Sequence, residues 1–411
     1  MTQRGHPFPY RTRKLSPVVP TIVARRRAVK IGRRQHPKVS TQQGGRFSFL
    51  WAFFFLREFI MELRRIFQNQ SVWDWFKSCR LPVVLYGMGD GADKVIAAFE
   101  RYGIEISAVM ASDGFVRGQT FHGFRVKTLA EVENEFGDFA VALCFASQLP
   151  EVMSAIKAVA ARHRTLVPSV PVFGDVLFDG EFINGNIDSM NAAYALMADD
   201  LSRRVYDNVL KFYYTGELSL LDEITTDKSE AFSLLNLGGS EVYVDLGAYN
   251  GDTIDEFLSY SGGTYRKIIA LEPNEKNFAK LRAHCEGMER VELWQLGAWK
   301  ENAVLTFNNK AGRNSAIADS GVQTRVAAVD SLLCGIKAGY VKADVEGADY
   351  ETLLGMRKTL ANRPKLNFAA YHRFEDIFRL PLLIHGLNPD YKIYLRHHPY
   401  IPAWDTNLYC I

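Results

Sequence analysis

The sequence predicts an α/β protein with two Rossmann-like units, of which the second has seven strands and an antiparallel last pair. Three observations predict this fold class. The 411 residues, 47% of them hydrophobic and 23% charged, have a globular composition and suffice for two or three cores of about 100–200 residues each. Apolar strand-like runs alternate with stretches of helical period. Glycine-rich turns at residues 87–92 and 247–251 follow such runs where a strand would pass into a helix.

The first 46 residues are a basic tail with twelve Lys or Arg and no acid. The remainder is acidic, with 37 basic against 46 acidic residues, so the overall charge does not indicate nucleic acid binding by the folded part. An apolar run at 47–56 is well short of the ~20 residues of a membrane-spanning helix, and Arg57 and Glu58 do not fit a signal-peptide cleavage site. Two interpretations of residues 1–60 stay open: a membrane-surface anchor, or sequence upstream of a natural start at Met61. We expect the second, with this stretch disordered or outside the natural protein.

The cysteines favour a reducing compartment. The chain has five, an odd number, and they are widely spread with no C-x-x-C pair. This pattern is atypical of a disulfide framework or a zinc site. We therefore expect a cytoplasmic protein with no stable membrane span.

Residues 61–180 are predicted to form the smaller Rossmann-like domain. A strand at 83–86 leads into Gly87-Met-Gly89-Asp-Gly91-Ala92 and then a helix that ends near Gly103. Gly87-x-Gly89-x-x-Ala92, with Asp113 roughly twenty residues on, satisfies a permissive dinucleotide-loop pattern. The alternative is a folded domain whose glycines serve only to turn the chain.

Residues 181–240 are a helical connector, in which apolar residues at helical spacing predict one helix over 187–215. The second domain, 241–411, carries seven candidate strands. They lie at 241–246, 267–272, 290–296, 340–345, 365–371, 391–397 and 406–411. The loop between the last two is too short for a crossover helix, so this pair should be antiparallel.

The second glycine turn predicts a nucleotide- or nucleoside-cofactor loop. Asp245 lies at a strand end, Gly247 and Gly251 form the turn, and a helix starts at Asp252. Glycine allows close approach of a ligand to the backbone, and the first turn of a helix attracts an anion. At the end of the next strand, Glu272 could accept both hydrogen bonds of a ribose diol. The alternative is a structural turn, with Asp252 as a helix cap and Glu272 solvated.

Residues 241–411 resemble the FkbM family of S-adenosylmethionine-dependent methyltransferases. Four segments carry the resemblance: Val244 to Thr253, Glu272-Pro273-Asn274, Val341 to Ala348, and Tyr371-His372-Arg373. The Lys-x-Asp-x-Glu-Gly run at 342–347 is the most specific of them. Asp349 departs mildly from the family, which more often has Glu there.

The resemblance implies the seven-strand class I methyltransferase fold and transfer of a methyl group from S-adenosylmethionine to a hydroxyl oxygen. It implies that Glu272 binds the ribose and that other cofactor contacts come from the glycine turn and neighbouring strand ends. The cofactor-binding candidates are Asp245, Gly247, Ala248, Tyr249, Gly251, Asp252, Glu272, Asn274, Gly297 and Ala298.

The catalytic candidates are His372, Asp344 and Glu346, which lie at the carboxyl edge of the sheet, where ligands bind in open α/β folds. A hydroxyl is a poor nucleophile, so one of them should accept its proton, and His372 is the candidate base. The two acids could instead cap the helix that begins near Ala348, and His372 could be solvated. Arg373 could bind an anionic group of the substrate or form a surface ion pair with Glu375 or Asp376. Nothing in the spacing requires a metal.

The sequence thus predicts an O-methyltransferase whose acceptor is a hydroxyl of a sugar, glycolipid precursor or polyketide-like product. We expect a small-molecule or sugar acceptor and no nucleic acid partner. Two alternatives stay open. One is a NAD-dependent dehydrogenase or epimerase of nucleotide sugars that uses residues 87–92; the other is a non-catalytic carbohydrate-assembly protein with a degenerate cofactor fold.

Overall fold

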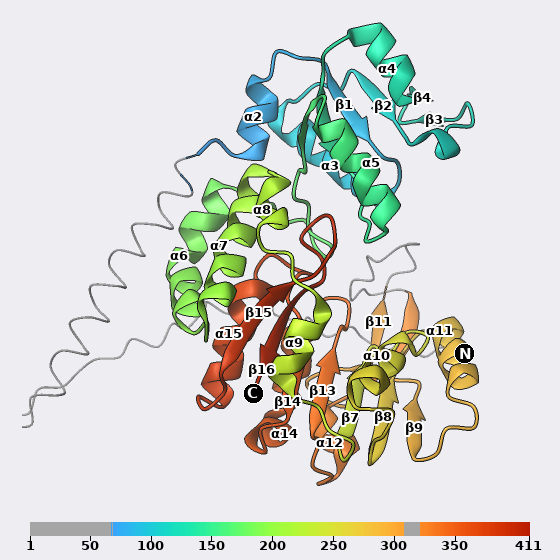
Figure 1. The fold of residues 1–411 in the computed structure, drawn as a ribbon, viewed down its shortest axis with the longest axis vertical. Helices are drawn as coiled ribbons and strands as arrows, with labels where there is room; N and C mark the ends of the chain where they lie inside the picture. Colours follow the sequence, from blue (N-terminus) through green and yellow to red (C-terminus); the bar gives the residue numbers. More distant parts are fainter. Residues whose placement is uncertain (1–66, 68, 308–320) are drawn as a thin grey trace, which may run out of the picture. The chain divides into compact units, whose positions relative to one another are not determined.

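The computed structural model describes residues 67, 69–307 and 321–411 (Figure 1). The expectations for residues 1–60 lie outside the described residues. Two parallel-type sheets with flanking helices confirm the predicted α/β fold class. None of the described helices combines the length and apolar character that a membrane crossing needs. The domain boundaries at 180 and 240 stay predictions.

The first domain has a six-stranded sheet in the order β3-β4-β2-β1-β5-β6. Its strands are β1 (Val83–Tyr86), β2 (Ala108–Met110), β3 (Thr120–Phe121), β4 (Phe124–Lys127), β5 (Ala140–Leu143) and β6 (Arg164–Leu166). Its helices are α2 (Val72–Ser78), α3 (Asp90–Tyr102), the 3₁₀ helix η1 (Asp113–Phe115), α4 (Leu129–Phe136) and α5 (Pro150–Ala160). β1, β2, β4, β5 and β6 pair in parallel, and β3 forms a hairpin with β4.

The connector holds α6 (Gly180–Ala195), α7 (Asp200–Thr215), α8 (Ser219–Asp222) and α9 (Lys228–Leu235). The prediction of one helix over 187–215 is wrong, because α6 ends at Ala195 and a new helix begins at Asp200. Asp199 caps this second helix by accepting a hydrogen bond from the Ser202 N–H, and such a cap favours a fresh helix start over a continuous one.

The second domain has a seven-stranded sheet in the order β15-β16-β14-β13-β7-β8-β9. Its strands are β7 (Val242–Leu246), β8 (Lys267–Leu271), β9 (Val291–Trp294), β13 (Tyr340–Ala343), β14 (Lys365–Ala369), β15 (Ile393–His397) and β16 (Thr406–Cys410). Its helices are α10 (Asp252–Tyr260), α11 (Glu275–His284), α12 (Val329–Leu333), α13 (Asp349–Leu354), α14 (Arg357–Ala361) and α15 (Asp376–Leu387). β16 is antiparallel to both β14 and β15, which confirms the predicted antiparallel last pair.

A small three-stranded sheet, which the sequence did not predict, follows β9. It consists of β10 (Gly297–Ala298), β11 (Ala303–Phe307) and β12 (Val322–Ala327), in the order β10-β12-β11. β11 and β12 are antiparallel, and β10 joins β12 in parallel.

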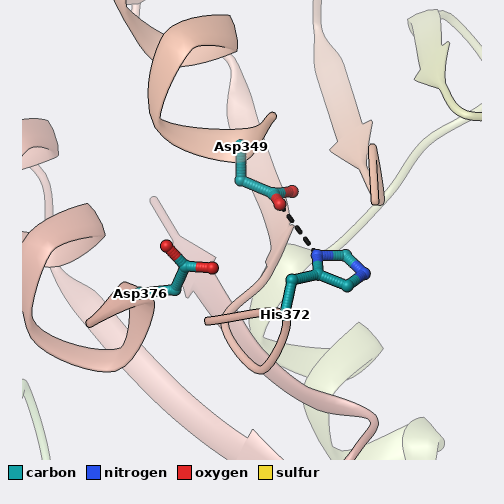
Figure 2. Close-up of side chains that lie close together, drawn as sticks. All are labelled: Asp349, His372 and Asp376. Atoms are coloured by element: carbon teal, nitrogen blue, oxygen red, sulfur yellow. Dashed lines mark hydrogen bonds and ion pairs between the residues drawn. The ribbon is translucent and has the colours of Figure 1, made fainter. Parts of the chain in front are cut away.

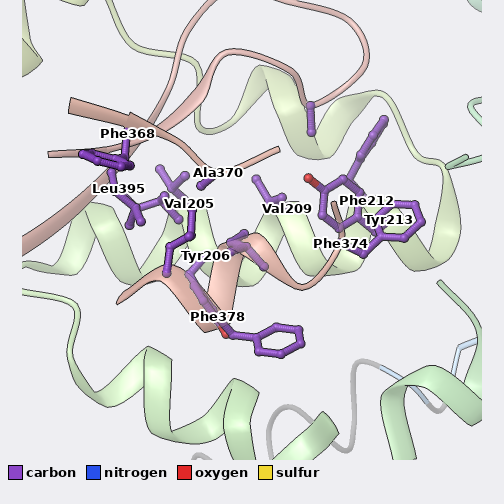
Figure 3. Close-up of a cluster of buried hydrophobic side chains, with 14 of the residues drawn as sticks. Val205, Tyr206, Val209, Phe212, Tyr213, Phe368, Ala370, Phe374, Phe378 and Leu395 are labelled. Carbon is purple, nitrogen blue, oxygen red and sulfur yellow. The ribbon is translucent and has the colours of Figure 1, made fainter. Parts of the chain in front are cut away.

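The connector helices share the core of the second domain. Figure 3 shows Val205 of α7 beside Leu395 of β15, and Tyr213 of α7 beside Phe374, which precedes α15; all of these are buried. At the sheet edge, buried Arg396 of β15 pairs with Asp199 before α7 at 2.7 Å and with Glu230 of α9 at 2.6 Å. α6 and α7 are therefore integral to the layer that covers this edge of the sheet (Figure 1).

Candidate functional site

The second glycine turn runs close to the neighbouring strand end. Gly247 has a φ of +82°, and a Cβ there would lie 2.0 Å from the Asp344 carbonyl oxygen. Gly251 has a φ of +97°, and its Cβ would meet the His284 ring at 2.5 Å. Both positions need glycine, because the backbone is left-handed and there is no room for a side chain. The turn therefore packs against the end of β13 at Gly247 and against α11 at Gly251.

Asp245 lies beneath this turn. It is fully buried and pairs in register with Lys342 of β13, whose Nζ is 3.4 Å from Asp245 Oδ1. Lys342 also donates to the Gly247 carbonyl at 2.9 Å, and Thr253 donates to Asp245 Oδ2 at 2.5 Å. Burial would lower the pKa of Lys342, but the charges of Asp245, Asp344 and Asp252 together outweigh it and raise that pKa. Within the described residues Asp245 Oδ1 has no hydrogen-bond partner, so this carboxylate is held by the Thr253 hydroxyl at Oδ2 and by the charge of Lys342.

Glu272 follows β8 and lies beside the turn. It is 6% exposed, and its two carboxylate oxygens accept hydrogen bonds from the Asn274 N–H at 2.8 Å and the Tyr249 N–H at 3.0 Å. Burial raises the pKa of Glu272 despite these two hydrogen bonds. A carboxylate has about four acceptor positions, so Glu272 is held in place and keeps acceptor capacity for a ligand.

The other predicted cofactor residues divide by their surroundings. Ala248 is buried in the turn, Asp252 begins α10, and Tyr249 is 48% exposed. Asn274 caps α11, because its side chain accepts from the backbone N–H of residues 276 and 277. Gly297 and Ala298 pair with β12, and the Ala298 carbonyl accepts from Thr352. The Asn274 side chain and the backbone of residues 297–298 thus already make hydrogen bonds within the protein.

Trp294 is a candidate that the sequence reasoning missed. It ends β9, is 37% exposed, and its carbonyl accepts the Glu272 N–H at 3.1 Å. An aromatic residue at the carboxyl end of a predicted strand was the available signal. A partly exposed indole at the carboxyl edge of the sheet offers a surface on which a flat base could stack.

Asp344 and His372 follow the adjacent strands β13 and β14, and the structure brings them together. His372 Nε2 lies 3.0 Å from Asp344 Oδ1. On the other side of the ring, His372 Nδ1 lies 2.8 Å from Asp349 Oδ2, the contact that Figure 2 shows. The Tyr371 hydroxyl donates to Asp344 Oδ2 at 3.0 Å. His372 therefore has no free ring nitrogen in this arrangement.

The charges of this group are strongly coupled. Burial would lower the pKa of His372, but Asp349 and Asp344 outweigh it and hold that pKa well above the ordinary value. Burial would likewise raise the pKa of Asp344, but the hydrogen bond and charge of His372 keep it well below its usual range. His372 is accordingly an imidazolium between two carboxylates.

Asp376, at the start of α15, completes the group. It is 3% exposed and accepts the Arg373 N–H at 2.9 Å, and burial together with Asp349 raises its pKa to about 8. Asp349, His372 and Asp376 each offer a ligand-type atom, all within 4.8 Å of one another (Figure 2). A cation here would have to displace the protons that already join His372 to its carboxylates, so the group is complete as a hydrogen-bonded network.

The capping alternative for Asp344 and Glu346 is not what the structure shows. The cap residue of α13 is Ala348, and no side chain caps that end. Glu346 is exposed with a φ of +53°. Arg373 donates from Nε to the Gly347 carbonyl at 3.2 Å, and no ion pair joins it to Glu375 or Asp376 in the part of the chain that the structure describes.

A segment that follows the first sheet covers His372. Phe173 is 6% exposed, its N–H donates to the His372 carbonyl at 3.1 Å, and its ring lies edge-on to the imidazole at 5.9 Å. Lys94 of α3 donates to the carbonyls of Pro171 and Val172 at 3.0 and 2.9 Å. The imidazole is thus enclosed by protein on this side.

The free energy of unfolding should fall as the pH rises from about 6.5 to 8. Folded His372 and Asp376 keep protons in this range, whereas the unfolded chain has released them, because both folded pKa values are raised. Each such group contributes up to about 1.4 kcal/mol per pH unit. Asp344 has a lowered pKa, so its contribution is lost only at acid pH. Thermal unfolding across this range measures the effect, and Asp376→Asn should flatten the slope. A slope unchanged by that substitution would contradict the assignment of the proton to Asp376.

The fold and this site define a class of protein: a Rossmann-like enzyme of the seven-strand methyltransferase class, with its acidic and glycine residues at the carboxyl edge of the sheet. The sequence profile described as the methyltransferase FkbM domain matches residues 245–400. The second domain belongs to the FkbM family, and the protein is a methyltransferase.

Solved structures are consistent with this family. The FkbM methyltransferase of Methylobacillus flagellatus KT is 21% identical, covers 89% of this chain and 99% of its own, and has a TM-score of 0.63. This likeness shows that the shared fold extends beyond the second domain. Two further structures each have a TM-score of only 0.29. An rRNA methylase of Streptococcus thermophilus is 18% identical and covers 44% of this chain and 92% of its own. The fibrillarin of Aeropyrum pernix, with bound S-adenosyl-L-methionine, is 11% identical and covers 44% of this chain and 73% of its own. Curated protein sequences give no match.

Proposed function

We propose that the protein transfers a methyl group from S-adenosylmethionine to a hydroxyl oxygen of a small molecule. The observation that carries the proposal is the position of Glu272, a buried carboxylate held against the glycine turn by the Tyr249 N–H at 3.0 Å in a domain of the FkbM family. The acceptor classes that we propose are a sugar, a glycolipid precursor or a polyketide-like product, with a nucleotide-linked sugar preferred.

The residues around the turn fit a sulfonium nucleoside. Glu272 retains acceptor positions for a ribose diol, and Trp294, whose carbonyl accepts the Glu272 N–H, has a partly exposed indole. The glycines at 247 and 251 keep side chains away from the turn. When bound, S-adenosylmethionine supplies an activated methyl carbon. We propose that Asp245 supports this site from below through Lys342 instead of touching the ligand, because it is fully buried.

We propose that Asp344 accepts the proton of the acceptor hydroxyl. Burial would raise the pKa of Asp344, but the hydrogen bond and charge of His372 lower it, so this carboxylate is a weak base. The proposed proton transfer is therefore late, because the acceptor oxygen becomes strongly acidic as it gains the methyl group. The sequence favoured His372, but its side chain is 2% exposed and both of its nitrogens face carboxylates, whereas the Asp344 side chain is 37% exposed. With S-adenosylmethionine bound, the acceptor oxygen would take the methyl group and leave the neutral thioether, and Asp344 would accept the hydroxyl proton. The protein would also accelerate the reaction by holding the acceptor hydroxyl in line with the methyl group.

The first glycine loop gives little support to a dehydrogenase. A Cβ at Gly87 would meet the Phe145 ring at 2.7 Å and one at Gly91 would meet the Cys144 carbonyl at 2.3 Å. Gly247 and Gly251 of the second loop meet protein atoms in the same way, so the glycines do not distinguish the two loops, and the carboxylate beside the loop does. Asp113 is exposed, with no N–H holding it against the loop among the described residues. After residue 46 the chain has more acidic than basic residues, which also disfavours a nucleic acid acceptor.

Titration calorimetry with S-adenosylmethionine and with NAD tests the proposal. We expect about one S-adenosylmethionine per chain and no heat with NAD, because only the second loop has a carboxylate held beside it. Binding of NAD alone would support the dehydrogenase, and binding of neither would support a non-catalytic scaffold. Incubation of candidate sugars with labelled methyl donor then identifies the acceptor and the methylated oxygen.

A further inference from the structure

Three side chains form a line from the protein interior to the edge of the site: Asp349, His372 and Asp344. We propose that Asp349 is a positioning residue for methyl transfer, which acts through His372 to fix the Asp344 carboxylate at the acceptor. The inference rests on the proposed function, because it assigns Asp349 a part in the same reaction.

Burial separates the roles of the three residues. The side chain of Asp349 is fully buried and that of His372 is 2% exposed, whereas that of Asp344 is 37% exposed. An acceptor molecule can therefore touch Asp344 but cannot reach Asp349. Any effect of Asp349 on the reaction must pass through the imidazole.

The geometry fixes the imidazole at two opposite points. Asp349 Oδ2 lies 2.8 Å from Nδ1, and Asp344 Oδ1 lies 3.0 Å from Nε2 (Figure 2 shows the first of these contacts). Because the ring is planar and rigid, the contact at Nδ1 sets the direction in which the Nε2–H points. Charge-assisted hydrogen bonds of this kind are short and strongly directional.

Asp344 is then held by both of its oxygens. Oδ1 faces His372, and Oδ2 accepts from the Tyr371 hydroxyl at 3.0 Å. Each oxygen retains a further acceptor direction. Loss of the Asp349 carboxylate would free the His372 ring to turn. Asp344 would then be oriented by the Tyr371 hydroxyl alone.

The groups around His372 come from several elements. Asp344 follows β13, Asp349 begins α13, Asp376 begins α15, and Phe173 covers the ring. Asp376 is within 4.8 Å of the pair but has no hydrogen bond to His372. Asp349 is therefore the carboxylate that directs the ring from the interior.

Asp349→Asn tests the inference, because asparagine keeps the shape of the side chain and removes its charge. We expect kcat to fall about 10- to 100-fold, a partial loss of general-base catalysis, while the Kd for S-adenosylmethionine stays within about twofold and the pH profile of kcat shifts. Asp349→Glu should recover part of the activity. Asp227→Asn, at the cap of α9, is the matched control, because asparagine caps a helix as well as aspartate does.

Nitrogen NMR of the histidine rings gives a readout independent of activity. In the wild-type protein at neutral pH we expect both nitrogens of His372 to carry protons, and in Asp349→Asn we expect the ring to lose one of them at lower pH. If the wild type is active and Asp349→Asn has the same kcat and pH profile, the inference is overturned while the proposed function stands. A metal ion that native mass spectrometry finds on the wild type and not on Asp349→Asn would also overturn the inference. A wild type that binds no S-adenosylmethionine would overturn the proposed function instead.

Discussion

Replacing Glu272 with alanine should weaken S-adenosylmethionine binding by about 10- to 100-fold. A hydrogen bond to a charged group contributes about 1.5–3 kcal/mol, and Glu272 is the carboxylate placed to accept from a ribose diol. Its loss also leaves the N–H groups of Tyr249 and Asn274 without their acceptor, although the backbone hydrogen bonds from residues 247 and 248 to the Leu271 carbonyl still join the turn to β8. Calorimetry with the variant measures the change in Kd.

Glu292→Ala is the matched control for this experiment. Glu292 lies on β9, next to β8, and forms a surface ion pair with Lys267 at 2.6 Å. Exposed pairs of this kind contribute little to stability, so we expect its affinity for S-adenosylmethionine to match the wild type. Equal affinities of Glu272→Ala and wild type would remove Glu272 from the cofactor site.

The elements that could be predicted from the sequence depend on local signals. The helix at Leu129–Phe136 begins at a Thr-x-x-Glu capping box, and the short loop after β15 requires an antiparallel partner. The break between α6 and α7 was missed because apolar spacing continues through it, while the capping by Asp199 depends on one side chain. The three-stranded sheet after β9 was missed because β10 has only two residues and the first four residues of β12 are largely exposed, so neither gives a clear apolar run.

The site was predicted in outline but not in its connections. Asp344 and His372 were identified as strand-end residues, and parallel neighbouring strands bring such residues together. Asp349 was noted in the sequence only as a departure from the family pattern, and its contact with His372 spans 23 positions of the chain. Asn274, which lies in a family motif, caps α11 in the structure, and its contact with a cofactor stays a prediction. Spacing along the chain carries no information on which side chain reaches which partner.

The same limit explains why the role of His372 changes. A histidine after a strand predicts a base when a ring nitrogen is free. The structure buries the ring and places a carboxylate at each nitrogen. A base must be within reach of the proton that it accepts, and in this group the half-exposed carboxylate of Asp344 meets that condition.

Asp344→Asn should lower kcat by about 10²- to 10⁴-fold, the range that a positioned general base contributes. The amide cannot accept the acceptor proton, and its NH₂ group would face a donor, either the His372 N–H or the Tyr371 hydroxyl. Affinity for S-adenosylmethionine should stay near normal, because Asp344 is proposed to touch the acceptor and not the ribose. The rate at which the methylated sugar forms in a single turnover separates the chemical step from binding.

Two comparisons make this result specific. Asp390→Asn changes an exposed aspartate before β15 and should leave kcat at the wild-type value. His372→Gln should reduce kcat less than Asp344→Asn, because it disturbs the orientation of the base without removing it. If His372→Gln were instead the more damaging change and Asp344→Asn stayed active, the proton would pass to the imidazole. The Nε2 atom would then have to leave Asp344 when the acceptor binds.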